Sequence, residues 1–203
     1  MMATSSRYCV PLRRRREGKT DYRIRKAFVI SGKPRFVARC TLKNVVVQIV
    51  VAKPHGDEVL VSAHSRELTE KFGWKAPRGN IPSAYLTGLL CGLKAKAQGV
   101  DEAVLDLGLH SPSKGARVFA VLKGVLDAGI NVPHSEEKLP DEGRIGGKHV
   151  AKYAESLTPN SETYQTMFSD YLKHELPPEN LPKHFAEVKK TVVATFKSGG
   201  KKT

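Results

Sequence analysis

Positive charge gathers at the N-terminal end of this chain, and that segregation limits how the chain can fold. Residues 1–44 contain thirteen Lys or Arg residues against two acidic ones, a net charge of +11, whereas the remaining residues carry only +3 of the total of +14. Within this segment Pro11 and Gly18 bracket four consecutive arginines, Arg13–Arg16, which would repel one another in a lone compact element. We therefore expect residues 1–19 to form an extended arm that becomes ordered when a partner neutralises its charge.

The pattern of charge also indicates the partner. A cationic segment attached to a nearly balanced body favours a defined surface for a polyanion over general solubility, so we predict a nucleic-acid-binding protein. Arginine suits this role because its guanidinium group donates paired hydrogen bonds to phosphates and stacks on unpaired bases. A nuclear-localisation tract or a solvated charge run is the alternative interpretation of the same residues.

The cysteines and the apolar residues argue against other classes of protein. Cys9, Cys40 and Cys91 are odd in number, far apart and free of any C-x-x-C spacing, which disfavours both a disulfide framework and a zinc site. A reducing cytoplasm is therefore the expected compartment. No stretch approaches the ~18 uninterrupted apolar residues of a membrane-spanning helix. We expect no membrane association, no metal, no cofactor and no small-molecule substrate.

The first half of the chain predicts a short helix followed by an antiparallel sheet. The run from Thr20 to Ser31 has apolar residues at helical spacing and stops before Gly32, which predicts a short basic helix. Three runs rich in β-branched and aromatic residues then predict the strands of an antiparallel meander, over residues 35–41, 45–51 and 59–65.

Period-two alternation in these strands predicts a sheet with one buried and one polar face. In the first strand Phe36 faces the core, and Arg35 and Arg39 face the other side. In the second strand Gln48 lies opposite the core-facing valines, and in the third strand Val59 is expected on the core side. The polar face would then be continuous with the arm.

The sequence after the meander predicts an α/β body. A helix from Ile81 to about Gln98, with Gly88 and Gly92 allowing close packing, is followed by an apolar strand over residues 103–107 and a helix from about Lys114 to Ala128. A strand, crossover helix and strand in succession place the new strand parallel to its neighbour. The predicted fold is a mixed sheet, an antiparallel three-strand meander plus one parallel strand, with packed helices.

Beyond Pro133 the chain becomes polar, and we expect it to extend from the core and to pack on neighbours. A short helix is predicted near Val150–Ser156 and two more over residues 160–175 and 182–197, with disorder from Ser198 to Thr203. The expected parts of the chain are an arm with its short helix over residues 1–33, an α/β core over 34–135 and a C-terminal extension over 136–203.

The candidate RNA-binding residues share a cationic or polar side chain, in the arm, in the short helix, on the polar sheet face or in a turn near a helix start. They are Arg13, Arg14, Arg15, Arg16, Lys19, Tyr22, Arg23, Arg25, Lys26, Lys33, Arg35, Arg39, Lys43, Asn44, Gln48, Lys114, Lys148 and His149. If these cations neutralise ~6 to 10 phosphates, affinity should fall by roughly three to five decades between about 50 and 200 mM salt.

Some of these assignments have an alternative. Tyr22 is as consistent with packing as with stacking on a base, and a merely solvated outer face would explain the polar sheet residues. The loop at Lys114 could place backbone N–H groups against a phosphate or only cap a helix, and the glycine-rich run Gly146–His149 could approach RNA or form a flexible turn. Asp57 and Asp106 stand in separate turns and strand ends, where surface or capping roles are expected.

The run over residues 7–50, RYCVPLRRRREGKTDYRIRKAFVISGKPRFVARCTLKNVVVQIV, resembles the opening of the 5S RNA-binding ribosomal protein L-eighteen family in its archaeal and eukaryotic form. Further matches are Gly79–Leu90, Val104–Leu109 and Gly129–His134, so the resemblance covers about residues 7–156. Their order and spacing make chance agreement an unsatisfactory explanation.

The resemblance implies a component of the large ribosomal subunit without catalytic activity. Such a protein attaches 5S ribosomal RNA in the central protuberance and also contacts the large-subunit (23S-type) rRNA and neighbouring ribosomal proteins, in cytoplasmic ribosomes. The segment after about residue 157 is weakly matched, and its contacts stay open. An RNA-processing enzyme and a nonspecific nucleic-acid-binding module are the rival functions. The residues that match the family's basic opening are Arg13–Arg16, Lys19, Tyr22, Arg23, Arg25, Lys33, Arg35, Arg39, Lys43 and Asn44.

Overall fold

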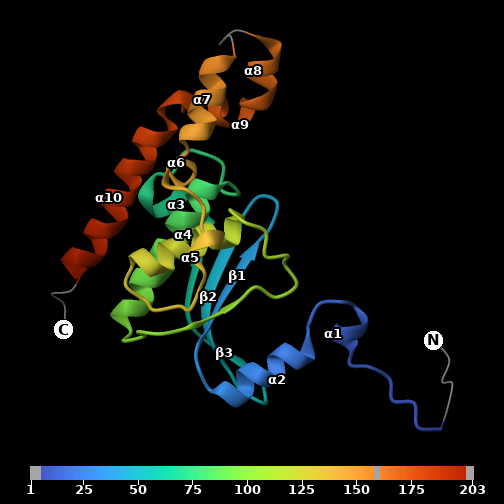
Figure 1. Cartoon of the computed structure of the whole chain (residues 1–203). Coiled ribbons are helices and arrows are strands. Elements are labelled where there is room, and N and C mark those ends of the chain that lie inside the picture. Colours follow the sequence, from blue (N-terminus) through green and yellow to red (C-terminus); the bar gives the residue numbers. More distant parts are fainter. Residues whose placement is uncertain (1–5, 158–160, 200–203) are drawn as a thin grey trace.

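The computed structural model describes residues 6–157 and 161–199, and it places a mixed sheet among helices with the N-terminal segment projecting at one end (Figure 1). The elements are α1 (Arg13–Arg16), α2 (Tyr22–Ser31), β1 (Arg35–Cys40), β2 (Val45–Ala52), β3 (Asp57–His64), α3 (Ser65–Phe72), α4 (Ile81–Ala97), β4 (Val104–Asp106), α5 (Arg117–Asp127), η1 (Glu136–Lys138), α6 (Glu142–Ile145), α7 (Lys148–Ser156), α8 (Glu162–Met167), α9 (Ser169–Lys173), η2 (Pro178–Asn180) and α10 (Leu181–Gly199).

The sheet has the strand order β3-β2-β1-β4, which confirms the predicted fold class. β1 and β2, and β2 and β3, pair antiparallel, and β1 pairs with β4 in parallel. Phe36 lies opposite Ile49, and Val47 lies opposite Ala63, each at most 1% exposed. This is the face that alternation assigned to the core, and α4 and α5 cover it.

Helix α4 is the centre of the molecule, enclosed by the sheet, α3, α5 and α10. Its glycines let α5 approach closely, as predicted: a Cβ atom at Gly88 would lie 2.1 Å from the carbonyl oxygen of Val121. From the other side, a Cβ at Gly124 of α5 would lie 2.2 Å from the carbonyl oxygen of Tyr85. The two backbones are therefore in contact where larger residues would force them apart.

The opposite face of the sheet is less polar than predicted. Val37 is 9% exposed and Val50 is 3% exposed, because helix α2 lies over this side. The predicted position of Val59 on the core side is wrong. A bulge between Ile49 and Val50 shifts the β2–β3 register, and Val59 pairs with Val50 and is 48% exposed. One extra residue in a strand turns the following side chain to the other face.

Several predicted elements have different bounds. Helix α3 was not predicted: the third strand ends at His64, and a capping box formed by His64 and Glu67 starts a helix immediately. Helix α5 begins at Arg117 and not at Lys114, which lies in the preceding turn. The predicted helix over residues 160–175 is divided into α8 and α9.

The C-terminal segment packs on the core of its own chain through aromatic contacts. In α10, His184 stacks on Trp74 with ring centroids 5.1 Å apart, and Phe185 lies 5.6 Å from the ring of Tyr85. Figure 1 shows α10 along one side of the molecule and α7, α8 and α9 at the end opposite α2. Disorder was predicted from Ser198, but α10 continues to Gly199, and residues 200–203 lie outside the described residues.

Candidate nucleic-acid interface

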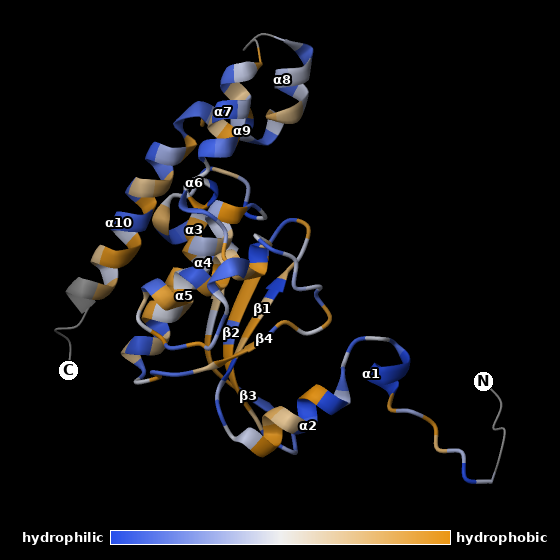
Figure 2. Ribbon diagram, viewed as in Figure 1, coloured by the Kyte–Doolittle hydropathy of each residue, from blue (hydrophilic) through white to orange (hydrophobic). Residues whose placement is uncertain are grey.

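The four arginines of the arm form one helical turn, α1, and not the extended chain that was predicted. Glu17 follows the turn and offsets part of the repulsion, because its carboxylate lies 2.9 Å from Lys19 Nζ and 3.8 Å from Arg13 Nε. Arg14 Nε donates to the hydroxyl of Thr20 at 2.8 Å. Figure 2 shows α1 as strongly hydrophilic, in contrast to the apolar strands β1 and β2.

The predicted short basic helix is present as α2, and the structure shows Asp21 as its N-cap. The Asp21 carboxylate accepts hydrogen bonds from the backbone N–H groups of Arg23 at 2.8 Å and Ile24 at 3.3 Å, and Gly32 ends the helix at φ 64°. The cations of this helix point in different directions. Arg23 and Lys26 are exposed, whereas Arg25 is turned toward the sheet.

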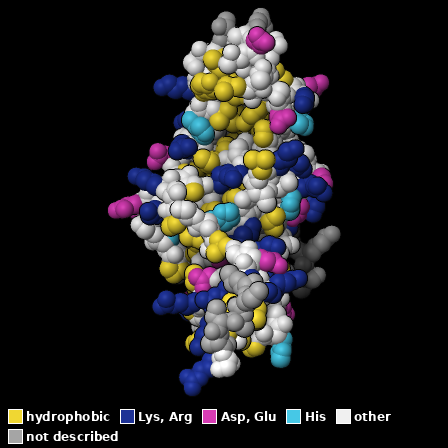
Figure 3. All heavy atoms as spheres, turned by 90° about the vertical axis from the view of Figure 1, so that its right-hand side faces the viewer, with side chains coloured by type: hydrophobic (Ala, Val, Ile, Leu, Met, Phe, Trp, Pro, Cys, Tyr) yellow, Lys and Arg dark blue, Asp and Glu magenta, His cyan; other side chains and the backbone are white. Residues whose placement is uncertain are grey.

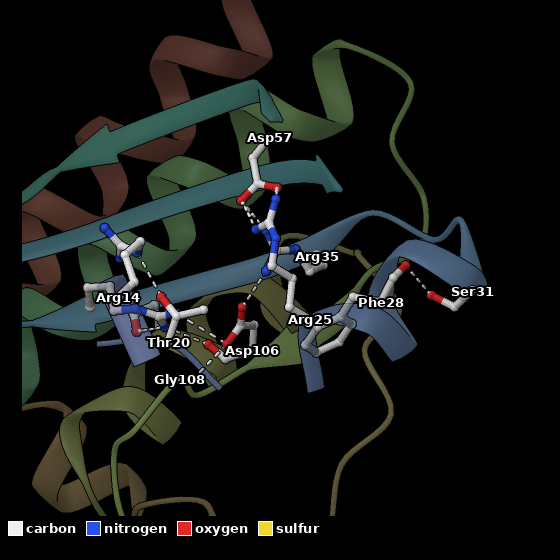
Figure 4. A network of polar contacts seen from close by, with 11 residues as sticks. Arg14, Thr20, Arg25, Phe28, Ser31, Arg35, Asp57, Asp106 and Gly108 are labelled. Atoms are coloured by element: carbon white, nitrogen blue, oxygen red, sulfur yellow. Dashed lines mark hydrogen bonds and ion pairs between the residues drawn. The ribbon is translucent and has the colours of Figure 1, made fainter. Parts of the chain in front are cut away.

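Arg25 belongs to a group of five charged residues that we name the carboxylate clamp: Arg25, Arg35, Arg39, Asp57 and Asp106. Arg25 Nη1 donates to Asp57 Oδ2 at 3.0 Å, and its Nη2 lies 2.8 Å from Asp57 Oδ1. Arg35 in β1 donates to the same Asp57 at 2.5 Å and to Asp106 Oδ2 at 2.8 Å. Asp57 thus connects α2 to the sheet (Figure 4).

Asp106, the last residue of β4, closes the clamp on the other side. Arg39 Nη2 lies 3.2 Å from Asp106 Oδ1, and the backbone N–H of Gly108 donates to that oxygen at 2.7 Å. The side chain of Asp106 is 8% exposed, and that of Arg35 is 7% exposed. Charges this deeply buried are tolerated because each one is paired and hydrogen-bonded.

The arginines of the clamp lower the pKa of the Asp57 carboxyl group. Its partial burial acts to raise the pKa, but the hydrogen bond from Arg25 and the charge of Arg35 outweigh burial and hold the pKa of Asp57 below its ordinary value. Asp57 therefore carries its negative charge at neutral pH. Arg35 also lies over the ring of Phe28, with Cζ 5.3 Å from the centroid, which adds a second contact between α2 and β1.

The cations of the N-terminal segment therefore divide into two groups. One group pairs with carboxylates: Arg25, Arg35 and Arg39 are in the clamp, Lys33 pairs with Glu102 at 3.2 Å, and Arg13 and Lys19 pair with Glu17. A second group, on α1, α2 and the segment before them, makes no ion pair with a carboxylate among the described residues, and its members are exposed; we name these the unpaired cations. They are Arg7, Arg14, Arg15, Arg16, Arg23 and Lys26. Figure 3 shows Lys and Arg side chains projecting from the lower part of the molecule, at the height of α1 and α2 in Figure 1.

The polar sheet residues were predicted to extend this surface, and the structure places them in two locations. Gln48 lies on the α2 side of β2, opposite Val37. Lys43 and Asn44 lie in the turn between β1 and β2, at the other end of the strands from α2. This turn is fixed by Arg117, which donates from Nη1 to the carbonyl oxygen of Thr41 at 2.8 Å.

The remaining candidates lie apart from the arm. Lys114 is exposed in the turn before α5, and Lys148 and His149 are the first residues of α7 at the opposite end of the molecule. Burial and the nearby charge of Arg144 lower the pKa of His149, so its ring is neutral at physiological pH. Lys114 and Lys148 are both near the α6 region, because Gly115 lies close to Arg144, and Gly143 lies close to Lys148.

Sequence reasoning missed three residues that position this surface. Asp57 and Asp106 were assigned surface or capping roles; Asp106 does accept the N–H of Gly108, but both carboxylates also bind Arg35, which was not predicted. Arg117, which follows the loop at Lys114, donates to the backbone carbonyls of Thr41 and Gly79. The alternation of β1 did place Arg35 and Arg39 on one face, yet nothing in it told which carboxylates would meet them.

Other chemistries find little support in the described part of the chain. Within residues 6–157 and 161–199, no group of three or more His, Cys, Asp or Glu residues has the arrangement needed to hold a metal ion. Burial raises the pKa of the Cys91 thiol to about 12, so this cysteine is protonated and unreactive. No helix among the described residues is both long and apolar enough to span a bilayer.

Fold and surface together define a basic α/β protein with a group of exposed, unpaired cations on an N-terminal segment, which the carboxylate clamp holds to a mixed sheet. A comparison with known protein families matches residues 6–101 and 93–135 to a family described as "Ribosomal large subunit proteins 60S L5, and 50S L18". The match covers more than half of the chain, and the chain belongs to this family of large-subunit ribosomal proteins.

Proposed function

We propose that this protein binds 5S ribosomal RNA and helps to attach it to the large-subunit rRNA in the central protuberance, as a structural component without catalytic activity. Membership in the family supports a place in the large ribosomal subunit and contact with rRNA and ribosomal proteins. The choice of 5S rRNA comes from the resemblance of the basic opening over residues 7–50 to the RNA-binding segment of such proteins.

The observation that carries this proposal is the division of the N-terminal cations. A clamp of paired charges holds α2 on the sheet, and the unpaired cations remain exposed on α1, α2 and the segment before them. Cations without a carboxylate partner can neutralise phosphates without first breaking an ion pair inside the protein. The paired arginines Arg25, Arg35 and Arg39 would then hold the RNA-binding surface in position. Arg35 is buried and would not contact the RNA.

The second cationic region provides a way to join two RNA molecules. Lys148 starts α7 with neutral His149 beside it, and Lys114 precedes Gly115, which lies close to Arg144 of α6. Figure 1 shows α6 and α7 away from α1 and α2. We propose that the N-terminal surface takes 5S rRNA and that this region, together with Lys43 and Asn44, faces the large-subunit rRNA or neighbouring ribosomal proteins. One protein with two separate cationic regions can bridge two RNAs.

A filter-binding titration tests the proposal. Deleting residues 1–19 removes Arg7, the four arginines of α1 and Lys19, but keeps Thr20 and the Asp21 cap of α2. Because four unpaired cations are lost, the slope of log affinity against log salt concentration should become shallower by roughly three to four, and 5S rRNA affinity should fall sharply near physiological salt. Unchanged binding by the shortened chain would overturn the proposal.

The same titration separates the rival functions. A nonspecific nucleic-acid module would bind duplex DNA as tightly as 5S rRNA, whereas the proposal expects a clear preference for the RNA. An RNA-processing enzyme would cleave RNA in a divalent-metal-dependent way that is lost with Asp106→Asn. The geometry argues against that enzyme, because the Asp106 carboxylate already accepts hydrogen bonds from Arg35, Arg39 and the N–H of Gly108.

A further inference from the structure

A half-open cavity lies between helix α2 and the sheet, beside the carboxylate clamp. Its accessible volume is about 230 Å³, and α1, α2, all four strands and the loop after β4 contribute to its wall. This volume is below the ~300–1,000 Å³ typical of sites for drug-sized molecules, so the cavity suits one flat ring system. All five residues of the clamp contribute to its wall, but their ion pairs with one another leave the space itself unfilled, and the phosphate contacts proposed above do not occupy it.

The lining of the cavity combines exposed apolar surface with cations. Ile24 is 46% exposed, Val59 is 48% exposed and Leu109 is 62% exposed, and all three line it. Five cations line the same wall, and three carboxylates, Asp21, Asp57 and Asp106, stand among them, so the lining keeps an excess of positive charge. Apolar side chains left open to water beside this excess, with unpaired Arg14 at the rim, indicate an occupant with an apolar face and a negative charge nearby. A nucleotide has both.

A hydrogen-bonding group inside the cavity is also without a partner. Gln48 lines the wall from the middle of β2, and its amide has no hydrogen bond to any described residue. The Nε atom of Arg35 is buried in the same region and also lacks a partner among the described residues. An amide offers a donor and an acceptor side by side, which is the pattern that reads the edge of a base.

We propose that this cavity is a nucleobase site: one unpaired base of the bound RNA inserts between α2 and the sheet, covers Ile24, Val59 and Leu109, and is read at its edge by Gln48. The flanking phosphates of the same nucleotide then lie among the unpaired cations of α1. This inference rests on the proposed RNA-binding function and adds to it a point of sequence recognition. Phosphate contacts alone position an RNA, whereas a base contact specifies it.

The substitution Gln48→Leu tests the site because it removes the hydrogen-bonding edge but keeps the charge and approximate size of the side chain. Gln98→Leu, at the C-cap of α4 and away from the cavity, is the matched control. Affinity for 5S rRNA should fall roughly tenfold for Gln48→Leu, with the salt slope unchanged because no phosphate contact is lost. The Gln98→Leu protein should bind as the wild type does.

A measurement on the RNA removes any dependence on how the variant folds. Abasic nucleotides are placed one at a time at the unpaired positions of 5S rRNA, and each RNA is titrated with wild type and with Gln48→Leu. One position should weaken wild-type binding about tenfold and should weaken the variant much less, because its base contact is already gone. If the wild type binds 5S rRNA tightly and no position is coupled to Gln48, the nucleobase site is overturned and the proposed function stands. If the wild type shows no preference for 5S rRNA over duplex DNA, the proposed function falls and the nucleobase site falls with it.

Discussion

The arginines of the carboxylate clamp and those of helix α1 are the same residue type and lie less than thirty positions apart, but they have different surroundings. Arg35 is 7% exposed at its side chain and touches two carboxylates, whereas Arg13 is 76% exposed and has one distant contact with Glu17. Loss of the carboxylate partner of a buried guanidinium group destabilises the fold strongly, because an unpaired charge is left buried. Loss of the partner of an exposed guanidinium group has little effect, because water solvates the charge. We infer that the arginines of the clamp position the RNA-binding surface and that the arginines of α1 contact the RNA.

This comparison shows why total charge is a poor guide to an RNA-binding site. The N-terminal residues 1–44 carry a net charge of +11, but Arg25, Arg35 and Arg39 are committed to Asp57 and Asp106, which come from later in the chain. The charge that is free to meet phosphates is therefore smaller than the sequence suggests. The three paired arginines of the clamp fix the orientation of α2 instead.

The largest expected effect is on folding, from breaking the buried side of the clamp. Asp106→Asn removes the charge that compensates Arg35 and Arg39, so the free energy of unfolding should fall by about 3 kcal/mol. Asp101→Asn is the control, because that carboxylate is 77% exposed and pairs only with Lys96, and it should change stability by less than about 0.5 kcal/mol. Urea denaturation followed by circular dichroism measures both. If both variants lost the same free energy of unfolding, the buried ion pairs of Asp106 would contribute no more to stability than an exposed pair does.

A smaller effect, on RNA affinity, distinguishes positioning from charge. Asp57→Asn and Glu58→Gln each remove one negative charge from adjacent residues, so a pure charge account predicts slightly tighter RNA binding for both. The clamp account predicts that Asp57→Asn binds about fivefold more weakly, because α2 loses an ion pair worth about 1 kcal/mol. Glu58 pairs only with exposed Lys53 and should follow the charge account. Tighter binding by Asp57→Asn would refute the positioning role.

The smallest expected effect is the pH dependence of the exposed side of the clamp. The pKa of Asp57 in the folded protein lies below its ordinary value of 3.8, so its contribution to stability is present above that value and is lost as the pH falls through the lower, folded-state pKa. Between about pH 5 and pH 3, wild type should lose up to about 1 kcal/mol more than Asp57→Asn. Parallel thermal melts across this range check the difference, and coincident curves would contradict it.

Local patterns in the sequence predicted much of the fold. Alternation located β1 and β2, the strand and crossover helix predicted the parallel position of β4, and the run from Thr20 to Ser31 before Gly32 predicted α2. These features depend on neighbours a few residues apart. The shift at Val59 and the helix α3 were missed because a bulge and a capping box each change the structure within one or two residues.

The sequence predicted which cationic residues form the candidate site, but it did not predict which carboxylates pair with them. The cationic segment is visible in the sequence, and the structure shows which of its members are exposed. Arg35 meets Asp106 from 71 positions away and Asp57 from 22 positions away, and only the assembled sheet brings the three together. The cavity at Gln48 has the same origin, because its walls come from α1, α2 and all four strands.

The most direct test of this account is the salt dependence of 5S rRNA binding in two triple variants of equal charge. Arg15, Arg16 and Lys26, changed together to alanine, remove three unpaired cations, and Arg66, Lys183 and Lys190, changed together to alanine, remove three exposed cations on α3 and α10. The account predicts that the first variant has a slope shallower by roughly two to three and that the second keeps the wild-type slope. Equal slopes in the two variants would contradict the claim that the unpaired N-terminal cations hold the RNA.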